Sequence, residues 1–360
     1  MGMSPSEISK FISEVEQNLT EPEALSRYGN GPVGMTDKGS VKLSTYGNPS
    51  VVLPGGNRFG NPTVELPKEK APADDRYYAG LDLGKNGIFR DAEDAVQAAV
   101  RAQKELMTRT LEERETYIQA MRRSCLENAE LLSRMACEET GYGHVEDKIA
   151  KHVLVAEKTP GTEDLKTIAK SGDKGLMLTE MAPFGVIGAI TPSTNPTATV
   201  INNAIGMIAA GNAVVYNPHP AAKKCSLTAV KLMNQAIVSA GGPDNLLCAP
   251  ENPTMQTSSV IMNHPVIRLL VVTGGEAVVS VAMKTGKKVI AAGPGNPPVV
   301  VDATADLDKA ARGIVAGAYY ENTILCIAEK EILAEASIAD ELIRGLVREG
   351  AYLVNEQELK

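Results

Sequence analysis

Cys326 is the residue of this chain whose type and surroundings best suit covalent chemistry. It lies in "AYYENTILCIAEK", residues 318–330, between an apolar run and a charged one. A cysteine thiolate attacks carbonyl carbons and forms covalent intermediates with them. Asn322 stands four residues earlier in the same segment. Taken alone, the segment fits either a nucleophile or an inert buried thiol.

The other four cysteines suit catalysis less well. Cys125 and Cys137 fall in helix-patterned stretches, and Cys248 ends a short apolar run, so all three are expected to be structural. Cys225 lies near a predicted helix start beside two lysines, where positive charge is expected to lower the pKa of a thiol. Because no second catalytic group is evident near Cys225, Cys326 is the stronger candidate.

Three loops could hold a ligand beside this thiol. They are "TPSTNP" at 191–196, "NPHP" at 217–220 and "TGGE" at 273–276, and each follows a predicted strand. Gly274 and Gly275 at a helix start would let backbone N–H groups approach a phosphate, although such a pair also occurs as a plain turn. The chain has no G-x-G-x-x-G sequence, so a dinucleotide would have to bind in another way.

A parallel sheet is expected to position these loops, because ligands gather at the carboxyl ends of its strands. Apolar, β-branched runs without alternation, separated by helical patterns, predict an α/β fold with helices on both faces. The predicted strands are 184–191, 212–217, 267–275, 287–292 and 297–302, and the predicted helices are 91–107, 111–141, 198–211 and 223–242, with Gly141 as a stop.

Composition excludes several classes of protein. The 360 residues carry a formal charge of -8 without a clustered Lys/Arg tract, which argues against nucleic acid as a partner. Five cysteines without a Cys-x-x-Cys pair fit a reducing, cytoplasmic compartment, and four scattered histidines argue against a metal site. The longest uncharged stretch, 181–222, is divided by five prolines, so no membrane span is expected.

The first 85 residues form a separate pattern. Residues 4–19 fit an amphipathic helix within a unit spanning 1–20, because Ser4 and Glu7 make a capping box and apolar residues recur on one face. Residues 21–85 are rich in Gly, Pro and Asn and are predicted to be a flexible linker or arm. Such a helix docks on a partner, packs on its own protein or is an inert tail.

Together, five ordered segments resemble the aldehyde dehydrogenase superfamily, and most closely its CoA-acylating branch. The segments are "ITPSTNP", "GNAVVYNPHP", "VVTGGEAV", "KKVIAAGPGNPPVVV" and "ENTILCIAEK". The resemblance implies an aldehyde dehydrogenase-like α/β fold. The implied fold has a parallel, Rossmann-type NAD- and CoA-binding domain at 86–293, and the first part of an α/β catalytic domain would follow at 294–360.

The same resemblance implies a mechanism. Cys326 would attack the aldehyde, with the oxyanion held by its backbone N–H and by Thr194 or Asn195, and hydride transfer to NAD would leave a thioester. Ala291 aligns where hydrolytic relatives carry a glutamate, so coenzyme A would replace water as the second nucleophile, unless the alignment is shifted and another acid serves. The implied cofactor-binding residues are Thr191, Pro192, Ser193, Asn217, Pro218, His219, Thr273, Gly274, Gly275, Gly293 and Gly295.

The resemblance further points to enzymes that act on propionaldehyde or acetaldehyde inside bacterial microcompartments. Residues 4–19 would then bind shell proteins, and the full-length protein would form a homo-oligomer. Two departures stand out: Asn217 replaces a lysine of relatives that bind NAD in the usual way, and the chain stops at Lys360, as expected of a partial chain. A hydrolytic aldehyde dehydrogenase and a non-catalytic microcompartment cargo protein remain alternatives. NAD or NADP preference is open.

Overall fold

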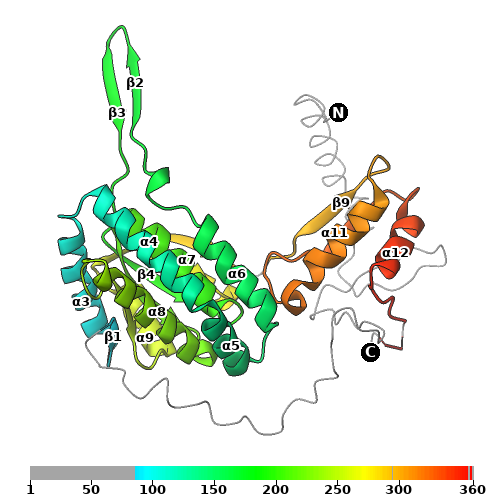
Figure 1. The fold of residues 1–360 in the computed structure, drawn as a ribbon, viewed down its shortest axis with the longest axis horizontal. Coiled ribbons are helices and arrows are strands. Elements are labelled where there is room, and N and C mark those ends of the chain that lie inside the picture. Colours follow the sequence, from blue (N-terminus) through cyan, green and yellow to red (C-terminus); the bar gives the residue numbers. More distant parts are fainter. Residues whose placement is uncertain (1–85, 294, 356, 359–360) are drawn as a thin grey trace. The chain divides into compact units, whose positions relative to one another are not determined.

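A computed structural model describes residues 86–293, 295–355 and 357–358 of the 360-residue chain. The predicted N-terminal helix at 4–19 and the predicted linker at 21–85 lie outside the described residues. Described helices and strands are numbered as in Figure 1.

A six-stranded, all-parallel sheet forms the centre of the larger part of the fold. Its strand order is β1-β6-β5-β4-β7-β8. Four of the predicted strands are confirmed here, whereas β1 and β6 were not predicted. The strands are β1 (Ile88–Phe89), β4 (Val186–Thr191), β5 (Ala213–Pro218), β6 (Leu247–Pro250), β7 (Ile267–Thr273) and β8 (Lys288–Ala292).

Helices cover both faces of this sheet, as the uniformly apolar strands predict. On one face α3 packs against β5 and β6 with α9 beside it, and on the other α7 and α8 pack against β5 with α4 over them (Figure 1). The helices are α3 (Ala92–Leu106), α4 (Leu111–Glu127), α5 (Ala129–Thr140), α6 (Val145–Lys158), α7 (Pro196–Ala209), α8 (Lys223–Ser239), α9 (Met255–Asn263) and α10 (Glu276–Met283).

Local sequence explains where several of these helices begin and end. Thr110 and Glu113 form a reciprocal capping box at the start of α4. The stretch predicted as one helix at 111–141 divides at Asn128 into α4 and α5. Gly141 ends α5 in the left-handed conformation, with its N–H donated to the Cys137 carbonyl, so the predicted stop is confirmed.

The residues after β8 build a second, smaller core. Strand β9 (Pro298–Val301) pairs in parallel with β10 (Glu331–Ala334) in a sheet of its own, not with the six-stranded sheet. Helices α11 (Leu307–Tyr319) and α12 (Ala339–Arg348) cover it, and Val301, Ile314 and Leu342 are buried between them. The segment that carries Cys326 connects α11 to β10.

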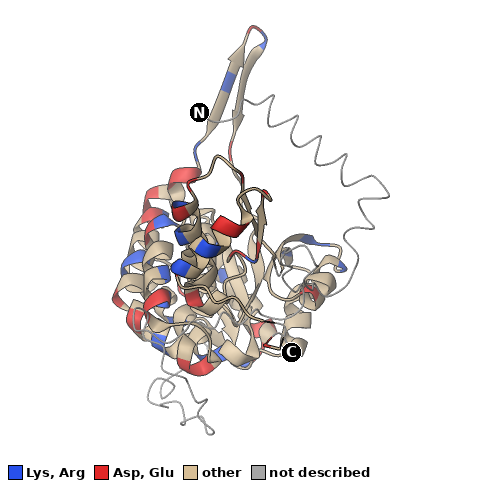
Figure 2. Cartoon of the chain, turned by 90° about the vertical axis from the view of Figure 1, so that its right-hand side faces the viewer, with Lys and Arg blue, Asp and Glu red and all other residues tan. Residues whose placement is uncertain are grey.

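A two-stranded antiparallel hairpin, β2 (Ile168–Gly172) with β3 (Gly175–Thr179), stands apart from both sheets (Figure 1). All ten of its strand residues are exposed. Charged residues of both signs are interspersed along the outer helices (Figure 2). Among the described residues, no helix is long and apolar enough to cross a membrane, and no group of His, Cys, Asp and Glu could hold a metal ion.

Candidate active site

Cys326 is exposed, and the other four cysteines are at least partly buried. Burial raises the pKa of the Cys125 thiol to about 12 and also raises that of Cys248. Burial raises the pKa of the half-buried Cys137 as well. A thiol that stays protonated and shielded is a poor nucleophile. Among the five cysteines, Cys326 is therefore the most accessible, and its role as nucleophile stays a prediction.

The expectation that neighbouring lysines lower the pKa of Cys225 is wrong. Burial of this thiol raises its pKa well above the ordinary value, and the negative charge of Glu139 raises it further. The carboxylate of Glu139 accepts the backbone N–H groups of Lys224 and Cys225, each at 2.7 Å. These contacts give Cys225 a structural role at the start of α8.

The turn η4 (Tyr320–Thr323) leads into the nucleophile loop through an unusual backbone. Glu321, Asn322 and Thr323 have φ values of 51°, 54° and 60°, which place three consecutive side-chain-bearing residues in the left-handed region. Each such residue costs about 1–3 kcal/mol, and the conformation persists only where surrounding contacts impose it. The contacts that impose it here come from α6.

The first turn of helix α6, with its cap, forms hydrogen bonds with three successive residues of η4. The Tyr320 hydroxyl donates to the Asp147 carbonyl at 2.8 Å, and the Glu321 N–H donates to the Asp147 carboxylate at 3.0 Å. The His144 ring, at the start of α6, lies 2.7 Å from the Asn322 amide oxygen. The backbone of the turn is therefore fixed from one helix end.

The Glu321 carboxylate lies in a buried ion cluster with two lysines of α6. Its side chain has no exposed surface, and Lys148 Nζ lies 2.5 Å from Oε1. Lys151 binds the other carboxylate oxygen. Burial lowers the pKa of Lys151, while the hydrogen bond and the charge of Glu321 act in the opposite direction. Removing one partner of such a pair leaves an uncompensated buried charge, which lowers the free energy of unfolding by about 3–5 kcal/mol.

Lys330 closes the nucleophile loop from its other end. Its ammonium donates to the carbonyls of Ala328 at 3.0 Å and Leu325 at 3.2 Å, with Thr323 at the longer distance of 3.5 Å. Burial lowers the pKa of Lys330, and the charge of Cys326 is among the groups that raise it. One cation thus organises the backbone on both sides of the thiol.

The first predicted ligand loop, 191–196, is attached to the same lysines. The Asn195 side-chain oxygen accepts a hydrogen bond from Lys151, and the Thr194 carbonyl lies 3.5 Å from Lys148 Nζ. The two candidates for the oxyanion site, Thr194 and Asn195, are therefore joined through α6 to the loop that carries Cys326. Their predicted catalytic role stays a prediction.

The second loop lies beside the first. Thr191 pairs with Pro218 in the β4–β5 register, and the His219 N–H donates to the Thr191 carbonyl at 3.0 Å. The His219 ring accepts the Ala221 N–H at 3.1 Å, which makes it the cap of a short 3-10 helix. This contact gives His219 a structural role, and its predicted cofactor contact stays a prediction.

Asn217, a predicted cofactor-binding residue, is engaged in contacts within the protein. Its side chain is 5% exposed, and its oxygen accepts a hydrogen bond of 2.7 Å from the Thr257 hydroxyl. Its Nδ2 lies 3.4 Å from the Thr254 carbonyl. The amide is therefore occupied in holding the start of α9 against β5, and a direct cofactor contact stays a prediction.

The third loop opens toward free space. Thr273 pairs with Ala292, and the Gly274 N–H donates to the Ala292 carbonyl at 3.2 Å, next to Gly293. A Cβ added at Gly275 would meet no described atom within 4 Å. The N-terminus of α10 follows this opening, and the N–H groups of Val278 and Val279 both donate to the Gly275 carbonyl.

The last predicted cofactor residue, Gly295, lies against the nucleophile loop. A Cβ atom at this position would fall 3.0 Å from the Cys326 carbonyl oxygen. Its observed contact is thus with the catalytic segment, and the contact with a cofactor stays a prediction. For Pro192 and Ser193 the structure gives a position in the first loop only.

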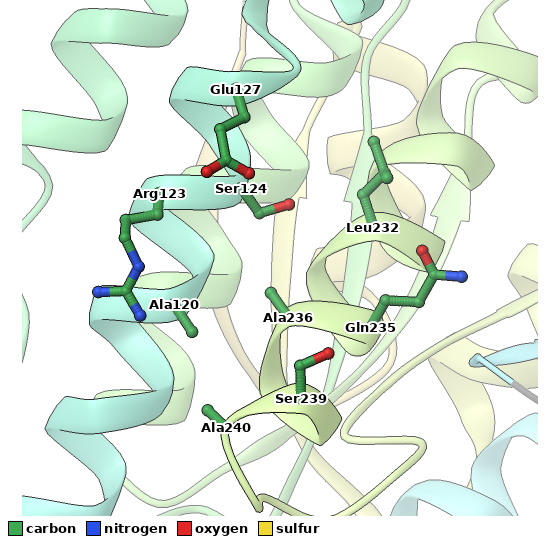
Figure 3. A pocket seen from close by; sticks show the side chains of 9 residues that line it. All are labelled: Ala120, Arg123, Ser124, Glu127, Leu232, Gln235, Ala236, Ser239 and Ala240. Atoms are coloured by element: carbon green, nitrogen blue, oxygen red, sulfur yellow. The ribbon is translucent and has the colours of Figure 1, made fainter.

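A surface pocket between α4 and α8, with a volume of about 330 Å³, contains none of the predicted site residues (Figure 3). Its lining includes Arg123 and Glu127 of α4 and Gln235 and Ser239 of α8. The pocket offers neither a thiol nor an open helix end. The predicted site is instead built from four neighbouring strand ends and the loop around Cys326.

Sequence reasoning missed the charged residues that connect these parts. Lys148, Lys151 and Glu321 carry no motif, and Lys330 was read only as the end of the nucleophile segment. The available signal is weak: Lys148 and Lys151 are spaced to share one helix face, and Glu321 precedes Cys326 by five residues.

Comparison with known proteins decides the family. The sequence matches the aldehyde dehydrogenase family over residues 70–358. The chain belongs to this family. The predicted fold class, a parallel Rossmann-type sheet with an α/β catalytic part, is confirmed as an aldehyde dehydrogenase fold.

Members of the family that are similar to this chain include acylating enzymes. The acetylating acetaldehyde dehydrogenase of Bilophila wadsworthia is 53% identical over 281 residues, which are 78% of this chain and 58% of that protein. A propionaldehyde dehydrogenase from the fucose utilisation microcompartment of Clostridium phytofermentans is 52% identical, with a TM-score of 0.73, over 75% of this chain and 62% of that one.

A third relative was solved with ligand and intermediate. The Rhodopseudomonas palustris propionaldehyde dehydrogenase, with bound CoA and an acylated cysteine, is 49% identical, with a TM-score of 0.74. The match covers 76% of this chain and 63% of that one. The chain therefore spans less than two thirds of the length of each of these relatives.

Proposed function

We propose that this chain provides the cofactor sites and the nucleophile for oxidation of a short aliphatic aldehyde, propionaldehyde or acetaldehyde, to its acyl-CoA. The observation that carries the proposal is the junction of Asn195 with the Cys326 loop through the lysines of α6. Relatives named as acylating dehydrogenases of acetaldehyde and propionaldehyde support the substrate class.

The residues act in a definite order in this proposal. The Cys326 sulfur attacks the carbonyl carbon, and the electron pair of the C=O bond moves onto oxygen, where the Cys326 N–H and the Asn195 amide stabilise it. A bound NAD would supply the acceptor for the hydride of the same carbon. The C=O bond would then reform and leave a thioester on Cys326. That thioester would be open to a thiol such as coenzyme A, which would take the acyl group while Cys326 leaves as thiolate.

Residues at the strand ends fit a dinucleotide. Thr191 is 2% exposed, and its hydroxyl has no hydrogen-bond partner among the described residues. A bound ligand could supply that partner. The open turn at Gly274 and Gly275 leads into the N-terminus of α10, where N–H groups and the helix dipole favour a phosphate. Both features support binding of NAD through this edge of the sheet.

The residue at position 291 favours coenzyme A over water as acyl acceptor. Ala291 of β8 pairs with Val272 of β7. Its side chain is a methyl group where hydrolytic relatives would supply a carboxylate. Without a general base, a contribution worth about 10²–10⁴-fold in rate is missing from water attack. The thioester would thus persist until a thiol removes it.

A coupled assay tests the proposal. Wild-type protein is incubated with propanal and NAD, with and without coenzyme A, and both NADH and acyl-CoA are measured. Sustained NADH formation only with coenzyme A, with one acyl-CoA per NADH, is the expected result. Equal NADH in both conditions with release of free acid would establish the hydrolytic reaction instead, and loss of activity in Cys326→Ser is expected in either case.

Two partner proposals accompany the enzymatic one. The microcompartment origin of the Clostridium relative supports a location in a cytoplasmic bacterial microcompartment, with residues 4–19 binding shell proteins. Deletion of residues 1–20 is expected to abolish co-purification with shells and to leave turnover unchanged.

The exposed apolar side chains of the hairpin support homo-oligomerisation through β2 and β3. Among them are Leu176, which is 67% exposed, and Leu178, which is 60% exposed.

A further inference from the structure

Two lysines of α6 each touch both loops of the candidate active site. Lys151 donates to the Asn195 side-chain oxygen in the loop after β4 and to the Glu321 carboxylate before Cys326. Lys148, three residues earlier, lies 3.5 Å from the Thr194 carbonyl and 2.5 Å from the other Glu321 oxygen. A shift of either loop therefore disrupts a charged contact with the other.

This cluster places two ammonium groups and one carboxylate next to Asn195. Side-chain exposure is 0% for Glu321, 2% for Lys148 and 13% for Lys151. Charge interactions in such a buried site are weakly screened. Asn195 is a neutral acceptor that receives a further hydrogen bond from Lys151.

The chemistry of the ammonium fixes the orientation of the Asn195 amide. An ammonium group only donates, so the amide oxygen faces Lys151 and the amide nitrogen faces away. The nitrogen lies 3.4 Å from the Thr194 hydroxyl, which is a long contact and occupies at most one of its two hydrogens. An amide whose oxygen is bound by a cation is also polarised, which strengthens donation from its nitrogen.

Resting on the proposed acyl-transfer function, we propose that Lys151 is a positioning residue for it. Lys151 presents the N–H groups of Asn195 to the substrate oxygen and ties that amide, through Glu321, to the loop that carries Cys326. When sulfur attacks the carbonyl carbon, the two oxyanion donors and the nucleophile thus keep one geometry. Lys151 keeps its proton throughout and touches no reacting atom.

Hydrogen exchange tests the connection independently of turnover. In Lys151→Met, peptides covering residues 191–196 and 320–326 are both expected to exchange at least about threefold faster than in wild type, because contacts that hold them are lost. Lys158→Met, an exposed lysine near the end of the same helix, is the matched control and leaves both peptides unchanged. Unchanged exchange of either peptide in Lys151→Met overturns the proposal.

Kinetics test the positioning role. Lys151→Met is expected to lower kcat for aldehyde oxidation about 10²-fold with KM changed less than about threefold, the cost of roughly 1 Å of misplacement. Lys151→Arg, which keeps charge and donors, is expected to recover at least about tenfold of that loss. Equal kcat in wild type and Lys151→Met contradicts the positioning role.

The two proposals fail in different measurements. A wild-type protein that forms no acyl-CoA refutes the proposed function, whereas the exchange of the two peptides still decides whether Lys151 joins them. If circular dichroism shows that Lys151→Met is unfolded, Lys151→Gln replaces it, because glutamine keeps a neutral donor and leaves the Lys148–Glu321 pair intact. The same exchange outcomes then support or overturn the role of Lys151.

Discussion

Gly295 lies against the backbone of Cys326: a Cβ atom at position 295 would fall 3.0 Å from the Cys326 carbonyl oxygen. Lys330 draws the neighbouring carbonyls of Leu325 and Ala328 toward its ammonium on the other side of the loop. The path of the chain at the nucleophile is therefore fixed by a glycine and a lysine together. Neither residue needs to touch the substrate to affect catalysis.

Gly295→Val tests this relationship. The branched side chain is expected to push the nucleophile loop away and to lower aldehyde oxidation at least about tenfold, because sub-ångström placement of reacting groups controls rate. Gly313→Ala in α11, where an added Cβ meets no described atom within 4 Å, is the control and should keep wild-type turnover. Initial NADH rates check both variants, and a Gly295→Val enzyme as fast as wild type would contradict the steric role.

Much of the sheet could be predicted because its strands are uniformly apolar. The runs that end at Thr191, Asn217 and Thr273 are long and β-branched, so their loops could be assigned to one edge before the structure was known. The strand β1 was missed because its two buried residues are too few to leave a pattern, and the exposed hairpin β2–β3 was missed because it has no buried face. Periodicity reports burial and is silent where burial is absent.

The connections within the site could not be predicted for a different reason. Lys151 and Glu321 are 170 positions apart, and their pairing depends on tertiary packing that local sequence does not encode. The misjudged pKa of Cys225 has the same origin: the sequence shows two lysines beside it, but not the burial and the Glu139 carboxylate that outweigh them. The sequence made Cys326 the candidate nucleophile, which stays a prediction, but it did not reveal the charged residues that hold its loop.

His152 should make the folded state sensitive to mild acid. Its ring is buried between the Thr197 hydroxyl at 2.9 Å and the Lys148 carbonyl at 2.7 Å, and burial lowers its pKa to about 4. Between pH 6.5 and 4 the His152 ring binds a proton in the unfolded chain but not in the folded chain. The free energy of unfolding should therefore fall by up to about 3 kcal/mol between pH 6.5 and 4.

Denaturant titrations across that pH range measure this contribution. His152→Gln, which has no titrating group, is expected to show a flatter decline than wild type, whatever its absolute stability. Parallel declines in the two proteins would show that the acid sensitivity originates elsewhere.

The hairpin provides a test of self-association. Leu176→Asp with Leu178→Asp places two charges on one face of β3, where side chains two residues apart point the same way. Charges buried in an interface are costly, so the double variant is expected to shift the protein to a smaller species. Lys174→Ser at the hairpin turn is the control. Light scattering after size exclusion reads the mass, and identical masses for both variants and wild type would remove the hairpin from the interface.

Ala291→Glu asks whether one side chain decides the acyl acceptor. Ala291 is exposed in β8, so a glutamate fits without displacing the core, and it would supply the general base that the segment lacks. Water attack on the Cys326 thioester is then expected to accelerate about 10²-fold or more, seen as NADH and free acid formed without coenzyme A. Ala292→Glu is the matched control, because the next residue of a strand points to the opposite face. If both variants still require coenzyme A, discrimination against water resides in its exclusion from the thioester and not in the missing carboxylate.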